Sequence, residues 1–163
     1  VKPNKAHKAL ASLEKAGKLK AVVTQNIDGL HQMAGSERVY ELHGSVERNH
    51  CMRCGKFVDL KDIYPRKGIP RCSCGGMLKP DVVLYEEGLD NDVVQGACRS
   101  IAEADLLIIG GTSLTVYPAA SFINLFRGRH LVLINKSATA MDARADLVIS
   151  DSIGETLAPF IDM

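Results

Sequence analysis

The sequence predicts an α/β protein in which a partial, doubly wound parallel sheet carries a small inserted metal-binding module. The last third of the chain alternates short apolar runs with helical segments, a pattern typical of a parallel sheet covered by helices on both faces. Residues 46–78 differ in character, because they are rich in Cys, Lys, Arg, Gly and Pro and have too few apolar residues to fold by burial alone. We therefore expect residues 1–45 and 79–163 to form one domain that this module interrupts.

The composition suits a globular domain with an apolar core. The 163 residues are 46% hydrophobic and 24% charged, and the net charge of +1 gives no global field that would select nucleic acid or a membrane surface. No apolar run approaches the roughly 18 residues that a membrane span needs, and no signal peptide opens the chain. We expect a cytoplasmic protein without a membrane partner. Because the sequence opens on Val1 and not on Met, we also expect a piece of a longer chain.

The first 45 residues predict helices and strands in alternation. Asn4 is placed to cap a helix that runs to Ala16, with apolar residues at helical spacing and Gly17 as the stop. The following segments are predicted as a buried strand, a short helix and a second strand, in this order: Lys20–Thr24, Leu30–Ala34 and Val39–Leu42.

The chain beyond the module continues the alternation. Predicted extended segments are Lys79–Tyr85, Leu106–Gly110, Leu131–Asn135 and Leu147–Ile149. Predicted helices run from Asp92 to Ala104, from Pro118 to Gly128, and from a capping box of Ser152 and Glu155 to Ile161. Cys98 lies on the apolar face of the first of these helices, so we interpret it as a small buried hydrophobe.

A polar cluster follows the strand that ends at Thr24. Gln25, Asn26, Asp28, Gly29 and His31 bring amides, an acid and an imidazole to a strand end, where α/β sheets bind ligands. Such side chains would suit a polar cofactor. An Asx-type turn that caps a short helix explains the same residues equally well, so both interpretations stay open at this point.

Four cysteines predict a metal site. Two close pairs separated by seventeen residues approach the spacing of a four-cysteine zinc ribbon, and clustered cysteines favour metal over disulfides in a reducing compartment. The second pair is tighter than the usual C-x-x-C, and His50 is a substitute ligand if one of its thiols cannot reach. With no open ligand position the ion should be structural. The predicted ligands are Cys51, Cys54, Cys72 and Cys74.

The charged residues around this site are unevenly spread. Between Val46 and Pro80 there are eight Lys or Arg and three acids, whereas Asp81–Asp92 carries five acids and no base. We interpret the basic side chains as a solvated surface that partly balances the charge of a zinc-thiolate centre, about −2. These are Arg48, Arg53, Lys56, Arg66, Lys67 and Arg71.

Taken together, the motifs resemble those of the sirtuins, NAD-dependent protein lysine deacylases, and look like a bacterial-type member. The resemblance runs over essentially the whole chain, in order. The blocks that carry it are Thr24 to His31, Glu41-Leu42-His43-Gly44, the four cysteines, Lys79 to Val83, Gly111 to Leu114 with Val116 and Pro118, and Ile134-Asn135. It implies NAD and a structural zinc ion as cofactors, and acyl-lysine proteins or peptides as partners.

The resemblance also implies individual roles. Gln25, Asn26 and Asp28 would line the pocket for the nicotinamide ribose and carboxamide, and His43 would be the general base. The acyl oxygen attacks C1′ of the ribose as nicotinamide leaves, and a base then deprotonates a ribose hydroxyl, a task that suits histidine at neutral pH.

Gly111, Thr112 and Ser113 would meet phosphate and ribose oxygens, Asn135 the adenine ribose, and Ser152 and Ile153 the adenine. Val83 and Tyr85 would bind the substrate backbone and wall the acyl-lysine tunnel. His7, His31 and His130 are interpreted as structural.

Two departures from the family pattern matter. Sirtuins open with a strand and a Gly-Ala-Gly-x-Ser loop, neither of which occurs here, and in the doubly wound order the first strand is central. We therefore expect an incomplete Rossmann-like domain with exposed strand edges at Lys20–Thr24 and Leu106–Gly110, and a fragment that alone binds NAD poorly and has little activity. Glu86 stands where many members have glycine, so the family's contacts at Glu86–Gly88 are not carried over to this chain.

The acidic run adds a hypothesis on specificity. Because it includes the proposed substrate strand, basic residues that flank an acyl-lysine should be favoured, and neutral residues at Glu86, Glu87 and Asp90 should weaken binding of basic peptides most.

Two functions from other classes compete with the deacylase. One is a zinc-ribbon nucleic-acid-binding module on an α/β scaffold. Phe57 and Tyr64 are the only aromatic residues of the basic segment that could stack on bases, so we do not expect nucleic acid as the partner. The other is a catalytically inactive acyl-lysine binder.

Overall fold

In the computed structural model, which describes residues 1–64 and 67–162, the chain divides into two compact units. The first, called the sheet unit below, consists of Val1–Val23, Leu30–Tyr40 and Asn91–Met163. The second, the cysteine unit, consists of Thr24–Gly29 and Glu41–Asp90. Each unit is described by itself.

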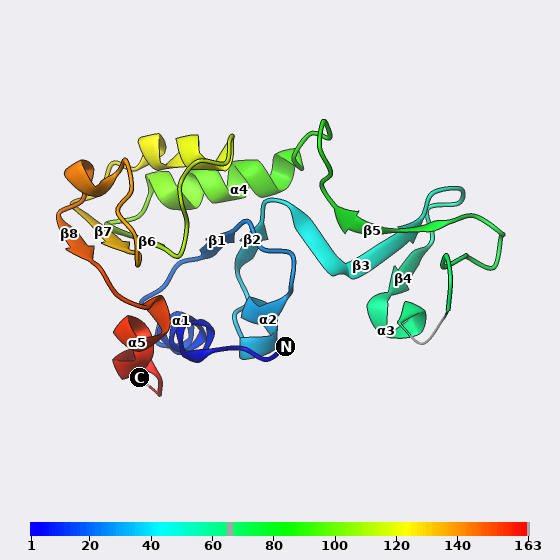
Figure 1. Ribbon diagram of the computed structural model, residues 1–163, viewed down its shortest axis with the longest axis horizontal. Coiled ribbons are helices and arrows are strands. Elements are labelled where there is room, and N and C mark those ends of the chain that lie inside the picture. Colours follow the sequence, from blue (N-terminus) through cyan, green and yellow to red (C-terminus); the bar gives the residue numbers. More distant parts are fainter. Residues whose placement is uncertain (65–66, 163) are drawn as a thin grey trace. The chain divides into compact units, whose positions relative to one another are not determined.

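A parallel three-stranded sheet forms the centre of the sheet unit (Figure 1). β6 (Leu106–Gly110) pairs with β7 (His130–Ile134), and β7 pairs with β8 (Leu147–Ile149), both in parallel. These strands are the apolar runs that the sequence predicts, shifted by one residue at β7. The predicted α/β fold with a parallel sheet is confirmed.

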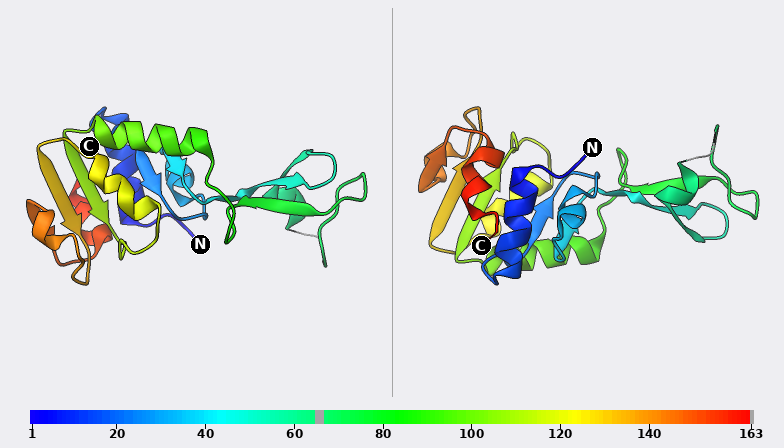
Figure 2. Two further views of the ribbon diagram at one scale, coloured as in Figure 1. Left: turned by 90° about the horizontal axis from the view of Figure 1, so that it is seen from above. Right: turned by 90° about the horizontal axis from the view of Figure 1, so that it is seen from below.

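Helices cover both faces of this sheet. Alternate strand residues Ile108, Val132 and Ile134 pack with Ala6 and Ala9 of α1 (Lys5–Lys15) and with Leu157 of α5 (Ile153–Leu157). The strand residues that alternate with these, Ile109, Leu131 and Leu133, pack on the other face against the 3-10 helix η1 (Ala119–Leu125). This helix also contacts α4 (Asn91–Ala102). Figure 2 shows α4 and η1 from one side, and α1 and α5 from the other. Burial on both faces explains the apolar run of residues 131–134 in the central strand β7.

The first helix follows its predicted boundaries. The side chain of Asn4 accepts a hydrogen bond from the backbone N–H of His7 at 3.2 Å, and the backbone N–H of Asn4 donates to Nδ1 of His7 at 3.3 Å. This reciprocal cap satisfies two backbone donors at the helix start. The helix is followed by Gly17, whose φ of +70° lies in the left-handed region typical of a residue that ends a helix. A short helix, α2 (Leu30–Ala34), forms where the sequence predicts it and lies against α1.

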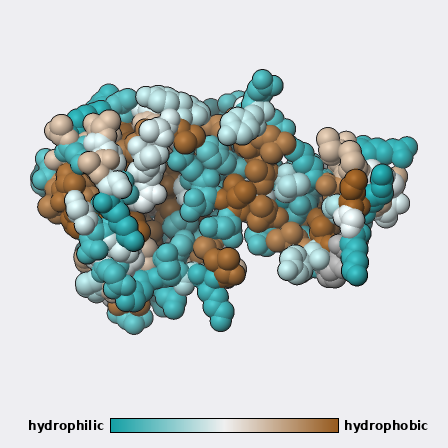
Figure 3. Space-filling view, viewed as in Figure 1, coloured by the Kyte–Doolittle hydropathy of each residue, from teal (hydrophilic) through white to brown (hydrophobic). Residues whose placement is uncertain are grey.

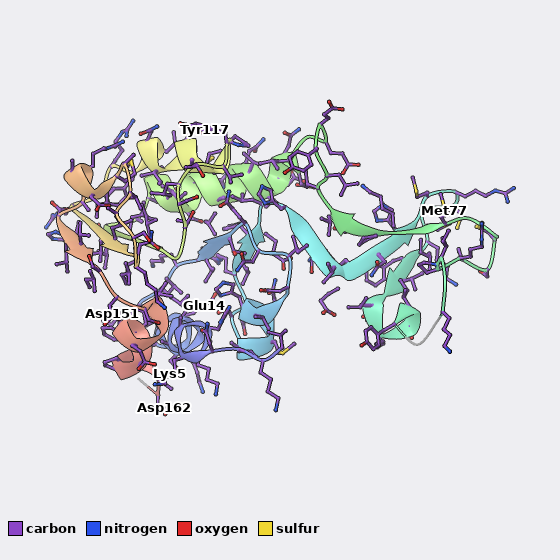
Figure 4. All side chains as sticks on the ribbon, viewed as in Figure 1. Lys5, Glu14, Met77, Tyr117, Asp151 and Asp162 are labelled. Atoms are coloured by element: carbon purple, nitrogen blue, oxygen red, sulfur yellow. The ribbon has the colours of Figure 1, made fainter. Side chains whose placement is uncertain are left out.

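Two predictions on the last helices are wrong in detail. The segment predicted as a helix from Pro118 to Gly128 forms the shorter 3-10 helix η1, and the final helix ends at Leu157 and continues as the 3-10 turn η3 (Ala158–Phe160). Ser152 occupies the N-cap of α5, but its side chain makes no capping hydrogen bond. Glu155 pairs instead with Lys5 of α1, at 2.9 Å between Nζ and Oε2 (Lys5 is labelled in Figure 4). A further 3-10 turn, η2, spans Asp142–Arg144.

An antiparallel sheet forms the cysteine unit. β3 (Gly44–Cys51) lies between β4 (Phe57–Asp59) and β5 (Leu78–Val82), and the one-turn helix α3 (Leu60–Ile63) follows β4. One buried apolar cluster of this unit contains Cys51, Cys72 and Leu78, with Val58 and Ile63 packed against it. A core this small needs an additional cross-link, as the sequence predicts.

A third, two-stranded sheet consists of β1 (Val22–Thr24) and β2 (Val39–Glu41). Within the described part of the chain, β6 pairs with β7 alone and β1 with β2 alone, so one edge of each strand is unpaired. Leu106 at the start of β6 is 47% exposed. Figure 3 shows other hydrophobic residues at the surface. The described helices include none that is long and apolar enough to cross a membrane.

Candidate active site and metal centre

The four predicted ligands form one cluster of thiols. β3 supplies Cys51 and the turn after it Cys54, while the loop before β5 supplies Cys72 and Cys74. The sulfur of Cys51 lies 3.5 Å from that of Cys74, the sulfur of Cys54 lies 3.8 Å from that of Cys72, and all four lie within 4.8 Å of one another. Tetrahedral zinc with Zn–S bonds of about 2.3 Å places its sulfurs about 3.8 Å apart. The cluster therefore fits a structural zinc ion, and the tighter second pair does reach.

Backbone amides face the sulfurs of Cys51 and Cys72 and favour their charged form, whereas at Cys74 the backbone amide of Gly76 is outweighed by hydrogen bonds with the neighbouring thiols, which raise the pKa of Cys74. The backbone N–H of Cys74 is the main cause that lowers the pKa of Cys72 to about 6. The backbone N–H groups of Cys54 and Arg53 lower the pKa of Cys51, against the effect of desolvation. Thiolates are the form that binds zinc, so this loop geometry prepares the site for a metal.

His43 lies in the turn between β2 and β3 and is half-buried. Its ring nitrogen Nδ1 is 3.1 Å from the backbone carbonyl oxygen of Gln25. A carbonyl oxygen only accepts, so Nδ1 must carry the hydrogen and donate it. In the neutral ring Nε2 is then the nitrogen that accepts a proton, which is the state a general base requires.

The polar loop 24–29 lies beside this histidine in the cysteine unit. Gln25 contributes its backbone carbonyl, as described, and its side chain is half-buried. The backbone N–H of Asn26 donates to Oγ1 of Thr24 at 3.1 Å, so the loop does contain a side-chain-stabilised turn. The side chain of Asn26 is exposed and that of Asp28 half-buried. The turn interpretation and the ligand interpretation are therefore compatible.

The predicted substrate segment continues from β5. The backbone N–H of Val83 donates to the carbonyl oxygen of His43 at 3.0 Å, which ties this segment to the histidine turn. Tyr85 is fully exposed. Glu86 has a φ of +69°, in the left-handed region that favours glycine, which accounts for the glycine that many sirtuins have there. Glu87 accepts hydrogen bonds from Lys79 and from the backbone N–H of Leu84, at 2.8 and 2.9 Å.

A second group of predicted residues lies at the carboxyl ends of β6 and β7 in the sheet unit. Gly111 follows β6 with a φ of +63°. Nδ2 of Asn135 donates to the backbone carbonyl of Thr112 at 3.2 Å, so the two strand ends are joined. The hydroxyl of Ser113 lies 2.8 Å from that of Thr115. Backbone and hydroxyl groups thus gather where α/β folds bind phosphates and ribose.

Ile153 and Ser152 lie beside this group. A Cβ added at Gly110, the last residue of β6, would meet the Cδ1 atom of Ile153 and lie 3.3 Å from its Cγ1 atom. Ile153 therefore packs on the strand end that leads into Gly111. Ser152 is half-buried at the start of α5. The sequence did not single out Thr115, although a second hydroxyl next to Ser113 is a signal that could have found it.

One interpretation of the basic residues is incomplete. The side chain of Arg48 is 45% exposed, as expected, but it is also paired: its Nη1 donates to Oε2 of Glu41 at 2.7 Å and its Nε donates to Oδ2 of Asp81 at 3.1 Å. Burial alone would lower the pKa of Arg48, but the hydrogen bonds and charges of the two acids outweigh it, and the pKa is raised. Arg66, from the same set, lies outside the described residues.

Comparison with known proteins decides the family. The family model of the Sir2 family matches residues 1–118. This chain belongs to the Sir2 family. The resemblance to the sirtuins is thus confirmed, on a match that includes the polar loop, His43 and all four zinc-site cysteines. Similarity continues beyond residue 118 in individual Sir2 relatives.

Two bacterial relatives match this Sir2 chain over nearly all of its length. An NAD-dependent protein deacetylase of Clostridium perfringens is 66% identical over 163 residues, which are 99% of this chain and 67% of the relative. An NAD-dependent protein deacetylase of Clostridium acetobutylicum is 63% identical over 162 residues, which are 98% of this chain and 66% of that relative. The chain therefore spans about two thirds of the length of the relatives that it matches.

Solved Sir2 structures have the same fold. A complex of Sir2 with a p53 peptide and NAD⁺ aligns with a TM-score of 0.90 at 39% identity, over 98% of this chain and 69% of that chain. A Sir2 homologue in complex with NAD aligns with a TM-score of 0.89 at 38% identity, over 98% of this chain and 64% of that chain.

Proposed function

We propose that the chain provides the zinc module, the general base and part of the NAD and substrate sites of an NAD-dependent protein lysine deacylase. The reaction transfers the acyl group from lysine to ADP-ribose and releases nicotinamide. The names of the Clostridium relatives support this assignment. The single structural observation that supports it best is the fixed tautomer of His43, whose Nδ1 donates to Gln25 while Nε2 remains the acceptor.

The roles of the other residues follow from their position. Bound NAD would supply the ribose carbon that accepts the acyl oxygen as nicotinamide leaves. Nε2 of His43 would then take a proton from a ribose hydroxyl. Gln25, Asn26 and Asp28 would orient the nicotinamide end, and the residues at the ends of β6 and β7 the rest of the dinucleotide. The latter are Gly111, Thr112, Ser113, Asn135, Ser152 and Ile153.

The substrate would bind along β5. In the described residues this strand is an edge of its sheet, with β3 on one side only. An extended peptide can add to such an edge through backbone hydrogen bonds, while Val83 and Tyr85 contact the acyl-lysine. Proteins or peptides that carry acyl-lysine are therefore the proposed partners.

The domain assignment is also a proposal. We infer that residues 46–78 are a zinc-binding module inserted into a Rossmann-like domain of residues 1–45 and 79–163. A cytoplasmic location is proposed with it, because zinc-ligating thiols require a reducing compartment and the five cysteines are all free.

The test is an activity assay on a chimaera. This chain replaces the matching two thirds of the C. perfringens relative, and release of nicotinamide and of the deacetylated peptide is followed with NAD and an acetyl-lysine peptide. We expect both products in equal amounts, and loss of the deacetylated peptide in His43→Ala. The matched control His130→Ala removes an exposed imidazole in the sheet unit and should retain activity. A chimaera that folds, binds zinc and makes neither product would refute the proposal.

The nucleic-acid-binding alternative has one observation in its favour. Phe57 and Tyr64 are 59% and 84% exposed on the basic zinc module. Salt-dependent binding of single-stranded DNA or RNA that is lost in a Phe57→Ala, Tyr64→Ala double variant would support it.

A further inference from the structure

Glu41 is a buried carboxylate at the end of β2, and its side chain is only 6% exposed. Burial of a charged carboxylate is costly unless a cation and hydrogen bonds compensate it. Arg48 provides both, through a short charge-assisted hydrogen bond of 2.7 Å from Nη1 to Oε2. Glu41 precedes His43 by two residues, so this pair anchors the chain just before the proposed general base.

The same guanidinium makes a second contact on another strand. Nε of Arg48 donates to Oδ2 of Asp81, in β5, at 3.1 Å. Asp81 is paired with Ser45 in the register of β3 and β5. One side chain therefore joins the end of β2, the strand β3 on which it lies, and β5. A planar fork of donors suits such a double contact better than the single ammonium of lysine.

Arg48 lies in an irregular part of β3. The register moves from Ser45 opposite Asp81 directly to Asn49 opposite Pro80, so residues 46–48 have no partner on β5. Nδ2 of the buried Asn49 donates to the carbonyl of Val46 at 3.1 Å and closes this bulge. Bulges next to active sites commonly redirect a strand or a side chain.

The bulge holds the loop that contacts the histidine. The backbone N–H of Val46 donates to the carbonyl of Ile27 at 3.0 Å, and Ile27 belongs to the polar loop 24–29. In the same loop, the carbonyl of Gln25 accepts the hydrogen bond from Nδ1 of His43. On its other side, His43 accepts the backbone hydrogen bond from Val83, next to β5. Both neighbours of His43 are therefore connected to the contacts of Arg48.

We propose that Arg48 is a positioning residue for His43, which it holds between the polar loop and β5 through its ion pairs with Glu41 and Asp81. This inference rests on the proposed function, because it assigns Arg48 to the same reaction. Arg48 itself touches neither NAD nor peptide in the proposal. Its effect is to fix the direction of Nε2, and errors of about 1 Å in such a direction can cost about a hundredfold in rate.

Two assays on the chimaera separate positioning from folding. Deacetylation needs the base, whereas exchange of labelled nicotinamide into NAD needs only the earlier step in which nicotinamide leaves. In Arg48→Met we expect kcat for deacetylation to fall about ten- to hundredfold, with exchange changed by less than about threefold. His43→Ala should lower deacetylation further than Arg48→Met does, again with little change in exchange. Equal losses in the two assays, or an unchanged kcat, would overturn the proposal.

Three further variants make the assignment specific. Arg48→Lys should restore part of the activity, because an ammonium can pair with one of the two acids. Adding Glu41→Gln to Arg48→Met should also restore part, because it removes the uncompensated buried charge. Lys61→Met is the matched control: it deletes an exposed ion pair with Asp59 in the same unit, at 3.2 Å, and should leave both assays unchanged.

A measurement that needs no catalytic turnover separates the role of Arg48 from the proposed function. Long-range ¹⁵N–¹H spectra of the full 163-residue chain, loaded with zinc, should show His43 with its hydrogen on Nδ1. Arg48→Met should yield a mixture of the two tautomers, whereas Lys61→Met should not. An inactive wild-type chimaera would refute the proposed function, and the tautomer alone would then decide the role of Arg48. An unchanged tautomer in Arg48→Met would overturn it.

Discussion

Gly44, which follows the proposed general base, offers a quantitative test of the β3–β5 junction. Its φ of +75° lies in the left-handed region, and a Cβ at this position would meet the carbonyl oxygen of Asp81. The added atom would also lie 2.8 Å from the carbonyl carbon of Asp81 and 3.3 Å from Cα of Val82. All three atoms are backbone, so relief requires the two strands to separate.

The cost of Gly44→Ala can be worked from these contacts. The left-handed conformation costs a residue with a Cβ about 1–2 kcal/mol. Separation of the strands at Gly44 and Val82 also weakens the neighbouring backbone hydrogen bonds, each worth about 1 kcal/mol. We therefore expect a loss of about 3 kcal/mol in the free energy of local unfolding. The bond from Val83 to the carbonyl of His43 is among those affected.

Hydrogen exchange measured by mass spectrometry is the suitable assay, because the sequence contains no Trp as a fluorescence probe. Peptides that cover residues 43–50 and 78–84 should exchange about a hundredfold faster in Gly44→Ala. Gly17→Ala is the matched control, with a φ of +70° and no atom within 4 Å of the added Cβ. Its loss of stability should therefore come from the left-handed backbone conformation alone. If both variants change their own segments equally, the contact between Gly44 and Asp81 is not as described.

Three further predictions concern other parts of the chain. Gly110→Ala would push against the flexible end of Ile153, so we expect a loss of only about 1 kcal/mol in urea unfolding, together with weaker NAD binding by the chimaera. Wild-type chain should contain about one zinc ion by elemental analysis, and Cys72→Ser should lose it together with the fold of its unit, because metal binding supplies folding energy here. The hydrogen bond from Lys79 is the main cause that lowers the pKa of Glu87 below its usual 4.5. The stabilisation that Glu87 gives to the turn is therefore full above pH 4.5 and is lost as the pH falls through the lower pKa of the folded state. As the pH falls through this range, hydrogen exchange of the Leu84 amide should become faster in the wild type, whereas in Glu87→Gln it should not show this change.

The sequence predicted those parts of the site that depend on residues close together in the chain. The four cysteines carry their ligand chemistry and spacing with them, and apolar runs at strand spacing fixed β6 and β8 to the residue. His43 was found through its motif and not through its surroundings. Its decisive contact, the carbonyl of Gln25, lies eighteen residues away and depends on the turn of the loop.

Features that depend on register or on distant partners were missed. The capping box predicted at Ser152 is absent: the side chain of Ser152 makes no capping hydrogen bond, and Glu155 pairs with Lys5, which is 150 residues away in sequence. Arg48 was interpreted as solvated together with the other basic residues around the cysteines. Its partners Glu41 and Asp81 lie on other strands, and the bulge of β3 in which Arg48 lies leaves no periodic signal in the sequence.

The turn after β5 shows how the structure narrows the hypothesis on the acidic run. Asp81 is neutralised by Arg48, and Glu87 is held by Lys79 and by the backbone, so neither is available to a basic peptide without losing an internal contact. Glu86 is exposed and keeps a left-handed conformation that costs about 1–2 kcal/mol relative to the glycine of many sirtuins. A preference for basic substrates would therefore not depend on Glu87, whose replacement would disturb the turn and would not test the charge.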